Sequence, residues 1–298
     1  MKYLDANLNL YKTFIAVYEA RKISGASVNI GIAEPTINYQ IRELEKMLGA
    51  KLFTSHSRGV EPTSEADTLY PSAMAAISTL EKAAENLRTF DENSEAKIRM
   101  ILPTTMAVTT LGHFFRDFRK KYPKIELEIY SRAQQENYNL FSLGQVDFVI
   151  DTDDICKKQN LKTIDFLTLN LVFIASKKFL IMNGFSQIID KNDLSKLALI
   201  GHVENIKKII NETELELSPY IKTSSYEPIY PLVRLGTGIG LFTREYMENQ
   251  DNDDVVELTI KNFNMQPQIK ISCGYDKSRL TKASMAFIDD LLAFIQKN

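Results

Sequence analysis

The first part of this 298-residue chain takes its fold from Ala26-Ser-Val-Asn-Ile-Gly-Ile-Ala-Glu-Pro-Thr-Ile-Asn-Tyr-Gln-Ile-Arg-Glu-Leu-Glu-Lys-Met-Leu48. Gly31 lies at a turn between two apolar segments, where a residue without Cβ adopts a left-handed backbone at little cost. Pro35 fits the first turn of the helix that follows, and the acidic Glu34 suits its dipole. One side of this helix carries an apolar stripe, formed by Ile37, Ile41, Leu44 and Leu48. The pattern predicts two helices that meet at a tight turn, a helix-turn-helix.

The other faces of the second helix are polar. Short hydrogen-bonding side chains lie near its amino end and cations lie further along, which is the order needed in a helix that enters a DNA major groove and rests on phosphates. The candidates for base-edge or groove contact are Thr36, Asn38 and Tyr39. The candidate phosphate anchors are Arg42, Lys46 and Arg58. The plainer alternative is a solvated helix face, the usual fate of polar residues opposite an apolar stripe.

A small wing and a long helix are predicted next. The wing consists of two short extended pieces, 51–53 and 58–60, around a polar tip. The long helix begins near Thr63 or Ser64, and Pro71 is expected to kink it or delay its first turn. Its heptad-like seam is formed by Leu69, Ala73, Ala76, Leu80, Ala83 and Leu87. Because alanines let two helices approach closely, the seam predicts dimerisation; the alternative is a helix that lies on its own body.

From about residue 96 onward, strand patterns alternate with helix patterns. Apolar or alternating runs predict strands at 98–102, 125–129, 148–150, 167–176, 197–200 and 269–273. Helical patterns lie between them, and a last helix is predicted at 282–296. Repeated strand-helix units imply mostly parallel sheets covered by helices, so the second part is expected to be α/β.

Several small polar residues follow these strands. They are Thr104 and Thr105, Asp151 and Thr152, and Gly201 and His202. Ligands of open α/β sheets bind beyond the carboxyl ends of the strands, where exposed helix amides can hold an anion. These residues are therefore the candidate small-molecule site. Alternatively, Thr104 only caps its helix and His202 is a loop histidine without a ligand; Asp151 argues against a ligand carboxylate placed directly on it.

Composition narrows the possible classes. The chain is 44% hydrophobic and 25% charged, as in ordinary globular proteins. The two cysteines are far apart in the sequence, and their spacing from each other and from the histidines is not that of metal ligands. The sequence also has no nucleophile elbow and no phosphate-binding loop. We therefore predict no enzymatic activity, no cofactor and no metal site. No apolar run reaches signal-peptide length or the roughly 20 residues of a membrane span, which predicts a cytoplasmic protein without membrane contact. Cations outnumber anions in residues 1–60, a small excess of positive charge that is compatible with a domain that binds DNA.

Several short pieces together resemble the amino-terminal domain of the LysR-type bacterial transcriptional regulators. In order, they are Phe14-Ile-Ala-Val, Ala26-Ser-Val-Asn-Ile, Pro35-Thr-Ile-Asn-Tyr-Gln-Ile-Arg-Glu-Leu-Glu, Leu48-Gly-Ala-Lys-Leu-Phe, Arg58-Gly-Val and Thr63-Ser-Glu. The resemblance implies a winged helix-turn-helix at 1–62, a linker and dimerisation helix at 63–92, and an effector-binding domain at 93–298. That domain would consist of two α/β subdomains like those of periplasmic solute-binding proteins, 93–163 plus 268–298 and 164–267. Leu161–Phe166 and Gln266–Ile271 would be the strands that cross between them.

The resemblance also implies a function. A homodimer or homotetramer would bind a partly palindromic double-stranded operator, and a small-molecule effector in the carboxy-terminal domain would modulate it. Three departures from the family pattern motivate an alternative, a cytoplasmic small-molecule sensor whose degenerate head serves only for oligomerisation. Ala33 stands where a Ser or Thr cap is common, Glu34 where Gln is usual, and Ser55 where a second wing cation is common.

Overall fold

The computed structural model describes residues 7–57, 59–131, 134–152, 156–157, 161–213, 215–250, 254–263 and 267–297. The chain divides into two compact units. The first comprises Met1–Thr89, Tyr138–Asp147 and Lys277–Thr281. The second comprises Phe90–Asn137, Phe148–Asp276 and Lys282–Asn298. The segment 138–147, expected to belong to the first α/β subdomain, thus clusters with the linker helix.

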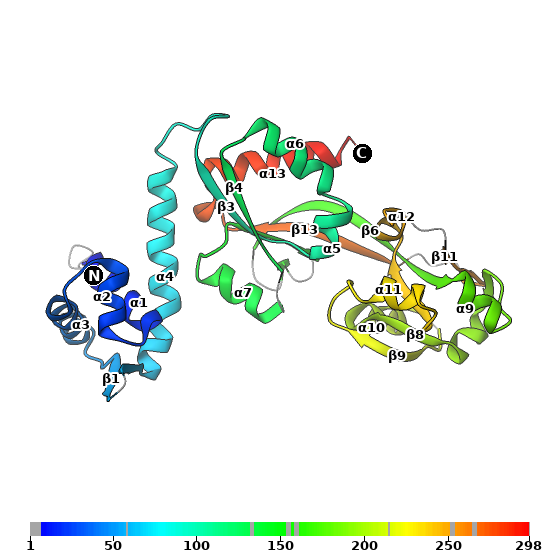
Figure 1. The fold of residues 1–298 in the computed structure, drawn as a ribbon, viewed down its shortest axis with the longest axis horizontal. Helices are drawn as coiled ribbons and strands as arrows, with labels where there is room; N and C mark the ends of the chain where they lie inside the picture. Colours follow the sequence, from blue (N-terminus) through cyan, green and yellow to red (C-terminus); the bar gives the residue numbers. More distant parts are fainter. Residues whose placement is uncertain are drawn as a thin grey trace. The chain divides into compact units, whose positions relative to one another are not determined.

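The first unit begins with the predicted helix-turn-helix and wing (Figure 1). Its elements are α1 (Leu8–Ala20), α2 (Ile23–Ile30), α3 (Glu34–Leu48), β1 (Phe53–His56) and β2 (Gly59–Pro62). Gly31 ends α2 with φ 67°, the left-handed conformation that the sequence predicts. β1 and β2 pair antiparallel as the wing. The helices enclose a buried apolar core that includes Phe14, Val17, Ala26, Ile37, Leu44 and Leu52.

Two details of α3 refine the sequence interpretation. Ala33 is the residue before its first turn and provides no side-chain hydrogen bond, as expected. Leu48, however, is 41% exposed, because it lies in the last turn of α3, immediately before Gly49 ends the helix. The buried stripe therefore ends at Leu44. One turn earlier than Leu48, the carboxylate of Glu45 accepts hydrogen bonds from Leu52 N at 2.9 Å and Lys51 Nζ at 2.8 Å, which attaches α3 to the wing.

The linker helix α4 spans Ser64–Glu85. The hydroxyl of Thr63 accepts a hydrogen bond from Ala66 N at 3.2 Å, so Thr63 caps the helix as predicted. The helix continues through Pro71 and ends at Glu85, so Leu87 lies beyond it, in the turn that follows. The helical seam therefore cannot extend to Leu87, and the helix is shorter than the predicted linker.

From residue 96 onward the chain contains the alternating strands and helices that the sequence predicts, most of them in the second unit. The elements from residue 96 to 202, including the 134–142 helix, are β3 (Ala96–Ile101), α5 (Thr104–Thr109), α6 (Gly112–Lys121), β4 (Ile125–Tyr130), α7 (Gln134–Ser142), β5 (Phe148–Thr152), β6 (Lys162–Ser176), α9 (Lys177–Met182), β7 (Ile188–Asp190), η2 (Lys191–Lys196) and β8 (Ala198–His202). They continue as α10 (Val203–Glu212), β9 (Ser218–Thr223), α11 (Ile229–Arg234), β10 (Ile239–Thr243), α12 (Arg244–Glu248), β11 (Val255–Glu257), β12 (Thr259–Lys261), β13 (Gln268–Tyr275), η3 (Lys277–Arg279) and α13 (Lys282–Ile295).

The main sheet has the strand order β4-β3-β5-β13-β6-β10-β8-β9, with β11 also paired to β6. β3 runs parallel to β4 and β5, and β8 runs parallel to β9 and β10. The long antiparallel pair of β6 and β13 joins these two parallel parts (Figure 1). These two strands correspond to the predicted crossings, but β6 also includes the run 167–176 in one continuous strand. Gln266 lies outside the described residues.

Helices α6 and α13 cover one part of the sheet (Figure 1). An aromatic cluster forms the core beneath them, because the ring of Phe287 lies 4.9 Å from Phe118, 5.1 Å from Phe114 and 5.5 Å from Phe148. None of the helices in the described ranges is long and apolar enough to cross a membrane.

Candidate functional site

The outward face of α3 carries the residues that the sequence proposes for DNA contact. Thr36, Tyr39, Arg42 and Lys46 are exposed, opposite the buried Ile37, Ile41 and Leu44. Within the described part of the chain, neither Arg42 nor Lys46 forms an ion pair, so both cations are available to phosphates. Arg58 lies outside the described residues. The face thus has the polarity that a groove-reading helix requires.

Two polar residues of α3 are partly engaged within the protein. Asn38 is exposed, but its Nδ2 donates a hydrogen bond to the carbonyl of Glu34 at 3.0 Å, which leaves its amide oxygen for a base. The amide oxygen of Gln40 accepts a hydrogen bond from the Thr13 hydroxyl at 2.5 Å and so attaches α3 to α1. Gln40 lies outside the apolar stripe of α3, and its contact with Thr13 depends on how the two helices cross, which the local sequence does not show.

The wing is attached to the end of α1. Val60 N donates a hydrogen bond to the carbonyl of Arg21 at 3.0 Å. A Cβ on Gly59 would lie 2.4 Å from the same carbonyl oxygen, so only glycine fits there. These contacts fix the start of β2 against the end of α1.

The predicted seam of α4 divides into two parts. Ala73 is buried in the core of the head and Leu69 packs against that core. At these two residues the helix therefore packs on its own domain, as in the alternative to dimerisation. By contrast, Ala76, Leu80 and Ala83 are exposed. Only this later part is free to meet a second helix.

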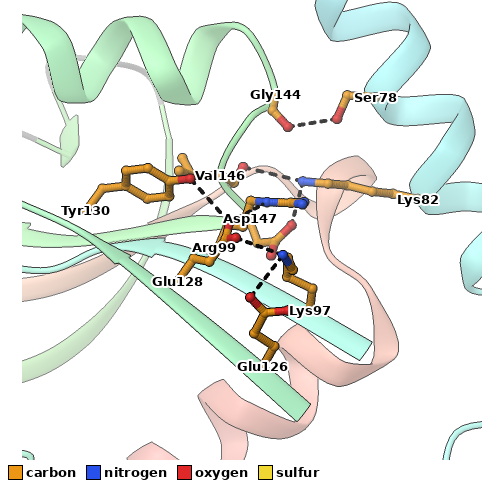
Figure 2. A network of polar contacts seen from close by, with 10 residues as sticks. All are labelled: Ser78, Lys82, Lys97, Arg99, Glu126, Glu128, Tyr130, Gly144, Val146 and Asp147. Atoms are coloured by element: carbon orange, nitrogen blue, oxygen red, sulfur yellow. Dashed lines mark hydrogen bonds and ion pairs between the residues drawn. The ribbon is translucent and has the colours of Figure 1, made fainter. Parts of the chain in front are cut away.

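Three residues at four-residue spacing, two on another face of α4 and one just after it, are bonded to the segments 138–147 and 277–281 of the same unit. Figure 2 shows the contacts of the first two, Ser78 and Lys82, with the segment 138–147. Ser78 Oγ donates to the carbonyl of Gly144 at 2.7 Å. Lys82 Nζ lies 2.5 Å from Asp147 Oδ1, and only 8% of Lys82 and 2% of Asp147 is exposed. Asn86 Nδ2 donates to the carbonyl of Leu280 at 2.8 Å. No local sequence pattern pairs these residues, so sequence reasoning missed them.

The small-molecule candidates lie at the carboxyl ends of β3, β5 and β8. Thr104 and Thr105 form the first turn of α5. Pro103 precedes that turn and no side chain caps it, so Thr104 is not a capping residue. Asp151 and Thr152 end β5, and Asp151 lies opposite Ser272 of β13. Burial raises the pKa of the Asp151 carboxyl group to about 6, although the backbone N–H of Thr152 donates to its Oδ1 at 2.7 Å.

Gly201 and His202 have structural roles of their own. A Cβ on Gly201 would lie 3.2 Å from side-chain atoms of Ile206 and Leu241, so the close packing of β8 favours glycine. His202 caps α10: its Nδ1 accepts a hydrogen bond from Glu204 N at 3.3 Å, and its Nε2 lies 3.2 Å from the carbonyl of Ser224. We infer from these partners that the proton is on Nε2 and that the ring is neutral; burial also lowers the pKa of His202. A ligand role for either residue remains a prediction.

Aromatic residues of this region were missed by sequence reasoning. The ring of Tyr226 stacks on His202 at 5.3 Å and meets Tyr246 edge-on at 6.0 Å. Its hydroxyl accepts a hydrogen bond from Asn205 Nδ2. Burial raises the pKa of both tyrosines, and the charge of Asp151 raises it further, which places the rings within electrostatic reach of the end of β5. Tyr226 lies in a polar loop, where nothing in the sequence signals this assembly.

Contacts between α5 and α12 also connect the two parallel parts of the sheet. The described residues contain no group of three or more His, Cys, Asp or Glu side chains that could hold a metal ion. The site at the strand ends offers hydroxyls, a carboxylate and aromatic rings.

Comparisons with known proteins agree with this architecture. The family described as "Bacterial regulatory helix-turn-helix protein, lysR family" matches residues 8–67, and the "LysR substrate binding domain" matches residues 91–296. The transcriptional regulator MetR of Buchnera aphidicola is 22% identical over 280 residues, 85% of this chain and 88% of that protein.

Solved structures show the same fold. A full-length OxyR variant from Pseudomonas aeruginosa has a TM-score of 0.70 at 14% identity, and the likeness covers 99% of this chain and 96% of that one. Full-length CbnR in complex with its target DNA has a TM-score of 0.54 at 15% identity, with 97% of this chain and 100% of that one covered.

The fold and the family matches define a transcriptional regulator with a winged helix-turn-helix head and an effector-binding domain. The chain belongs to the LysR family. Because the family match at residues 8–67 includes the whole helix-turn-helix and wing, the DNA-binding head is present, and the alternative of a degenerate head is not supported.

Proposed function

We propose that this LysR-type regulator binds a partly palindromic double-stranded operator in the cytoplasm as a homodimer or homotetramer. In this proposal α3 enters the major groove, with Thr36, Asn38 and Tyr39 at the bases and Arg42, Lys46 and Arg58 on phosphates. A small molecule at the ends of β3, β5 and β8 shifts the equilibrium between two arrangements of the assembly. Ligand and operator then alter each other's affinity by the same factor.

The outward face of α3 carries this proposal. The apolar residues of α3 pack into the core of the head. The exposed residues of the helix are hydrogen-bonding near its amino end and cationic further along. Base contacts supply specificity, and phosphate contacts supply affinity that depends on salt.

The exposed part of the α4 seam supports the homo-oligomer. Ala76, Leu80 and Ala83 lie at spacings of four and three on one side of a helix, and two alanines allow close approach of a second helix. A two-fold pair of heads reads two half-sites of opposite orientation, which is why a partly palindromic operator is expected.

The direct test is a gel-shift experiment with the full chain and genomic fragments from the neighbourhood of its own gene. We expect retardation of one fragment that unlabelled copies of the same fragment compete away and that equal amounts of unrelated DNA do not. A Tyr39→Ala variant should lose this preference while retaining weak binding to all fragments. Equal competition by every DNA would contradict sequence-specific regulation.

A further inference from the structure

The carboxylate of Asp151 has no cationic partner among the residues that the structure describes. It is partly buried at the carboxyl end of β5, and its hydrogen bond comes from the uncharged backbone N–H of Thr152 at 2.7 Å. Burial is the largest influence on its pKa, which is raised to about 6. At neutral pH this carboxylate is therefore ionised in surroundings that disfavour its charge.

The neighbouring rings offer an aromatic surface without a positive charge. Tyr226 is partly exposed. Its ring lies 6.1 Å from that of Phe242 at an interplanar angle of 60°, and 6.0 Å from that of Tyr246 at 88°. His202 stacks on Tyr226, but both of its nitrogens bond to the protein backbone as a neutral ring does. Ring faces of this kind attract cations and not anions.

Further carboxylates increase the negative potential of this region. Glu245 accepts hydrogen bonds from the backbone N–H of Asn170 at 3.0 Å and from its Nδ2 at 2.7 Å, both uncharged donors. Burial is the main cause of the raised pKa of the Tyr246 hydroxyl, and the charges of Glu245, Asp151 and Glu227 raise it further. An anionic ligand would meet repulsion here, whereas a cation would be attracted.

We propose that the effector bound at this site is a small organic cation, whose ammonium group pairs with the Asp151 carboxylate and whose carbon skeleton lies against the ring of Tyr226. This inference rests on the proposed function, because it takes the strand ends as the effector site. A ligand ammonium supplies the charge partner that the carboxylate lacks within the described chain, and the contact is strengthened by partial burial.

The test compares two four-carbon probes on the full chain. The cation is 1,4-diaminobutane and the matched anion is succinate; binding is measured by thermal shift and calorimetry at constant ionic strength. We expect 1,4-diaminobutane to raise the Tm and succinate to leave it unchanged. Asp151→Asn should weaken calorimetric binding of 1,4-diaminobutane at least about tenfold, as expected for loss of a charge-assisted hydrogen bond.

Two further variants make the test specific. Asp289→Asn changes the net charge equally at an exposed carboxylate of α13 and should bind 1,4-diaminobutane as the wild type does. Tyr226→Leu removes the aromatic face, retains Asp151, and should weaken binding of the diamine; it also keeps the test valid if Asp151→Asn folds poorly. Absence of any diamine effect, equal binding by Asp151→Asn, or a Tm increase with succinate would each overturn the inference.

The outcomes separate this inference from the proposed function. If succinate raises the Tm and changes operator binding, the regulator has an effector but not a cationic one. If 1,4-diaminobutane binds through Asp151 while the chain retards no DNA specifically, the cation site stands and the proposed regulation fails.

Discussion

Lys82 Nζ in the linker helix lies 2.5 Å from Asp147 Oδ1, and both side chains are buried. The ammonium group also donates to the carbonyl of Val146 at 3.4 Å (Figure 2). Asp147 immediately precedes β5, and the far end of the same strand carries Asp151. A single five-residue strand thus connects the attachment of the linker helix with the candidate effector site.

Removing one partner of the buried pair should destabilise the protein strongly. In Asp147→Leu the charge of Lys82 stays buried without its counter-ion, which costs about 3–5 kcal/mol of unfolding free energy. The double variant Lys82→Met with Asp147→Leu should recover most of that loss, because no isolated charge remains. Urea unfolding measures all three proteins. The exposed pair of Lys120 and Asp117 is the control, since Lys120→Ala should cost less than about 1 kcal/mol. A double variant no more stable than the single one would contradict the account.

The uncompensated carboxylate of Asp151 should make stability depend on pH. Its pKa in the folded protein is raised from 3.8 to about 6, so the unfolded chain ionises first as pH rises. The stability contributed by the protonated group is present below about pH 4 and lost as pH increases through about 6. Asp151→Asn should therefore be more stable than the wild type at pH 8, by up to about 3 kcal/mol, and equal to it near pH 4. Urea unfolding at both pH values checks this, with Asp289→Asn as the control that shows no such difference. Equal stability of Asp151→Asn and the wild type at pH 8 would show that the carboxylate is compensated.

The exposed part of the α4 seam should be needed for assembly. Leu80→Lys places a charge on the proposed interface, and in a two-fold pair the two lysines repel each other. Sedimentation should show that self-association weakens at least about tenfold, the effect of about 1.4 kcal/mol. Glu81→Lys introduces the same residue on the neighbouring, exposed side of the helix and should leave assembly intact. The seam would be excluded as the interface if both variants associated like the wild type.

The missing cap of α3 should be repairable. Ala33 precedes the helix and provides no hydrogen bond to its first amides. Ala33→Ser supplies an acceptor there and should increase the unfolding free energy by about 0.5–1 kcal/mol. Ala84→Ser, an exposed substitution inside α4, gains no such bond and should be neutral or slightly destabilising. Thermal unfolding of the two variants gives the comparison; a loss of stability in Ala33→Ser would mean that the backbone there cannot accept the cap.

The parts predictable from sequence are those that depend on local periodicity and turn chemistry. The apolar stripe from Ile37 to Leu44 and the turn at Gly31 define the helix-turn-helix without any distant contact. The strand runs near 98–102, 125–129 and 148–150 were recognisable for the same reason. The spacing of Leu48 also fits the stripe, but periodicity does not show where the core ends.

The parts that sequence could not predict are tertiary pairings. Lys82 pairs with Asp147, which lies 65 positions further along the chain, and each residue alone looks like a solvated charge. In the same way, Tyr226 comes within electrostatic reach of Asp151 although the two residues lie 75 positions apart in the sequence, and no local pattern links them. The role of Glu45 as acceptor for the wing amides also depends on the path of the chain after α3.

The central claim is that the outer face of α3 lies on duplex DNA, and the salt dependence of operator binding tests it most directly. For the full chain, the logarithm of affinity should fall linearly with the logarithm of salt concentration, and Arg42→Ala should reduce the slope by about 0.9, the contribution of one phosphate contact. Arg119→Ala, an exposed arginine of α6 outside the head, should leave slope and affinity unchanged. An identical slope in the wild type and Arg42→Ala, or no slope at all, would contradict the account.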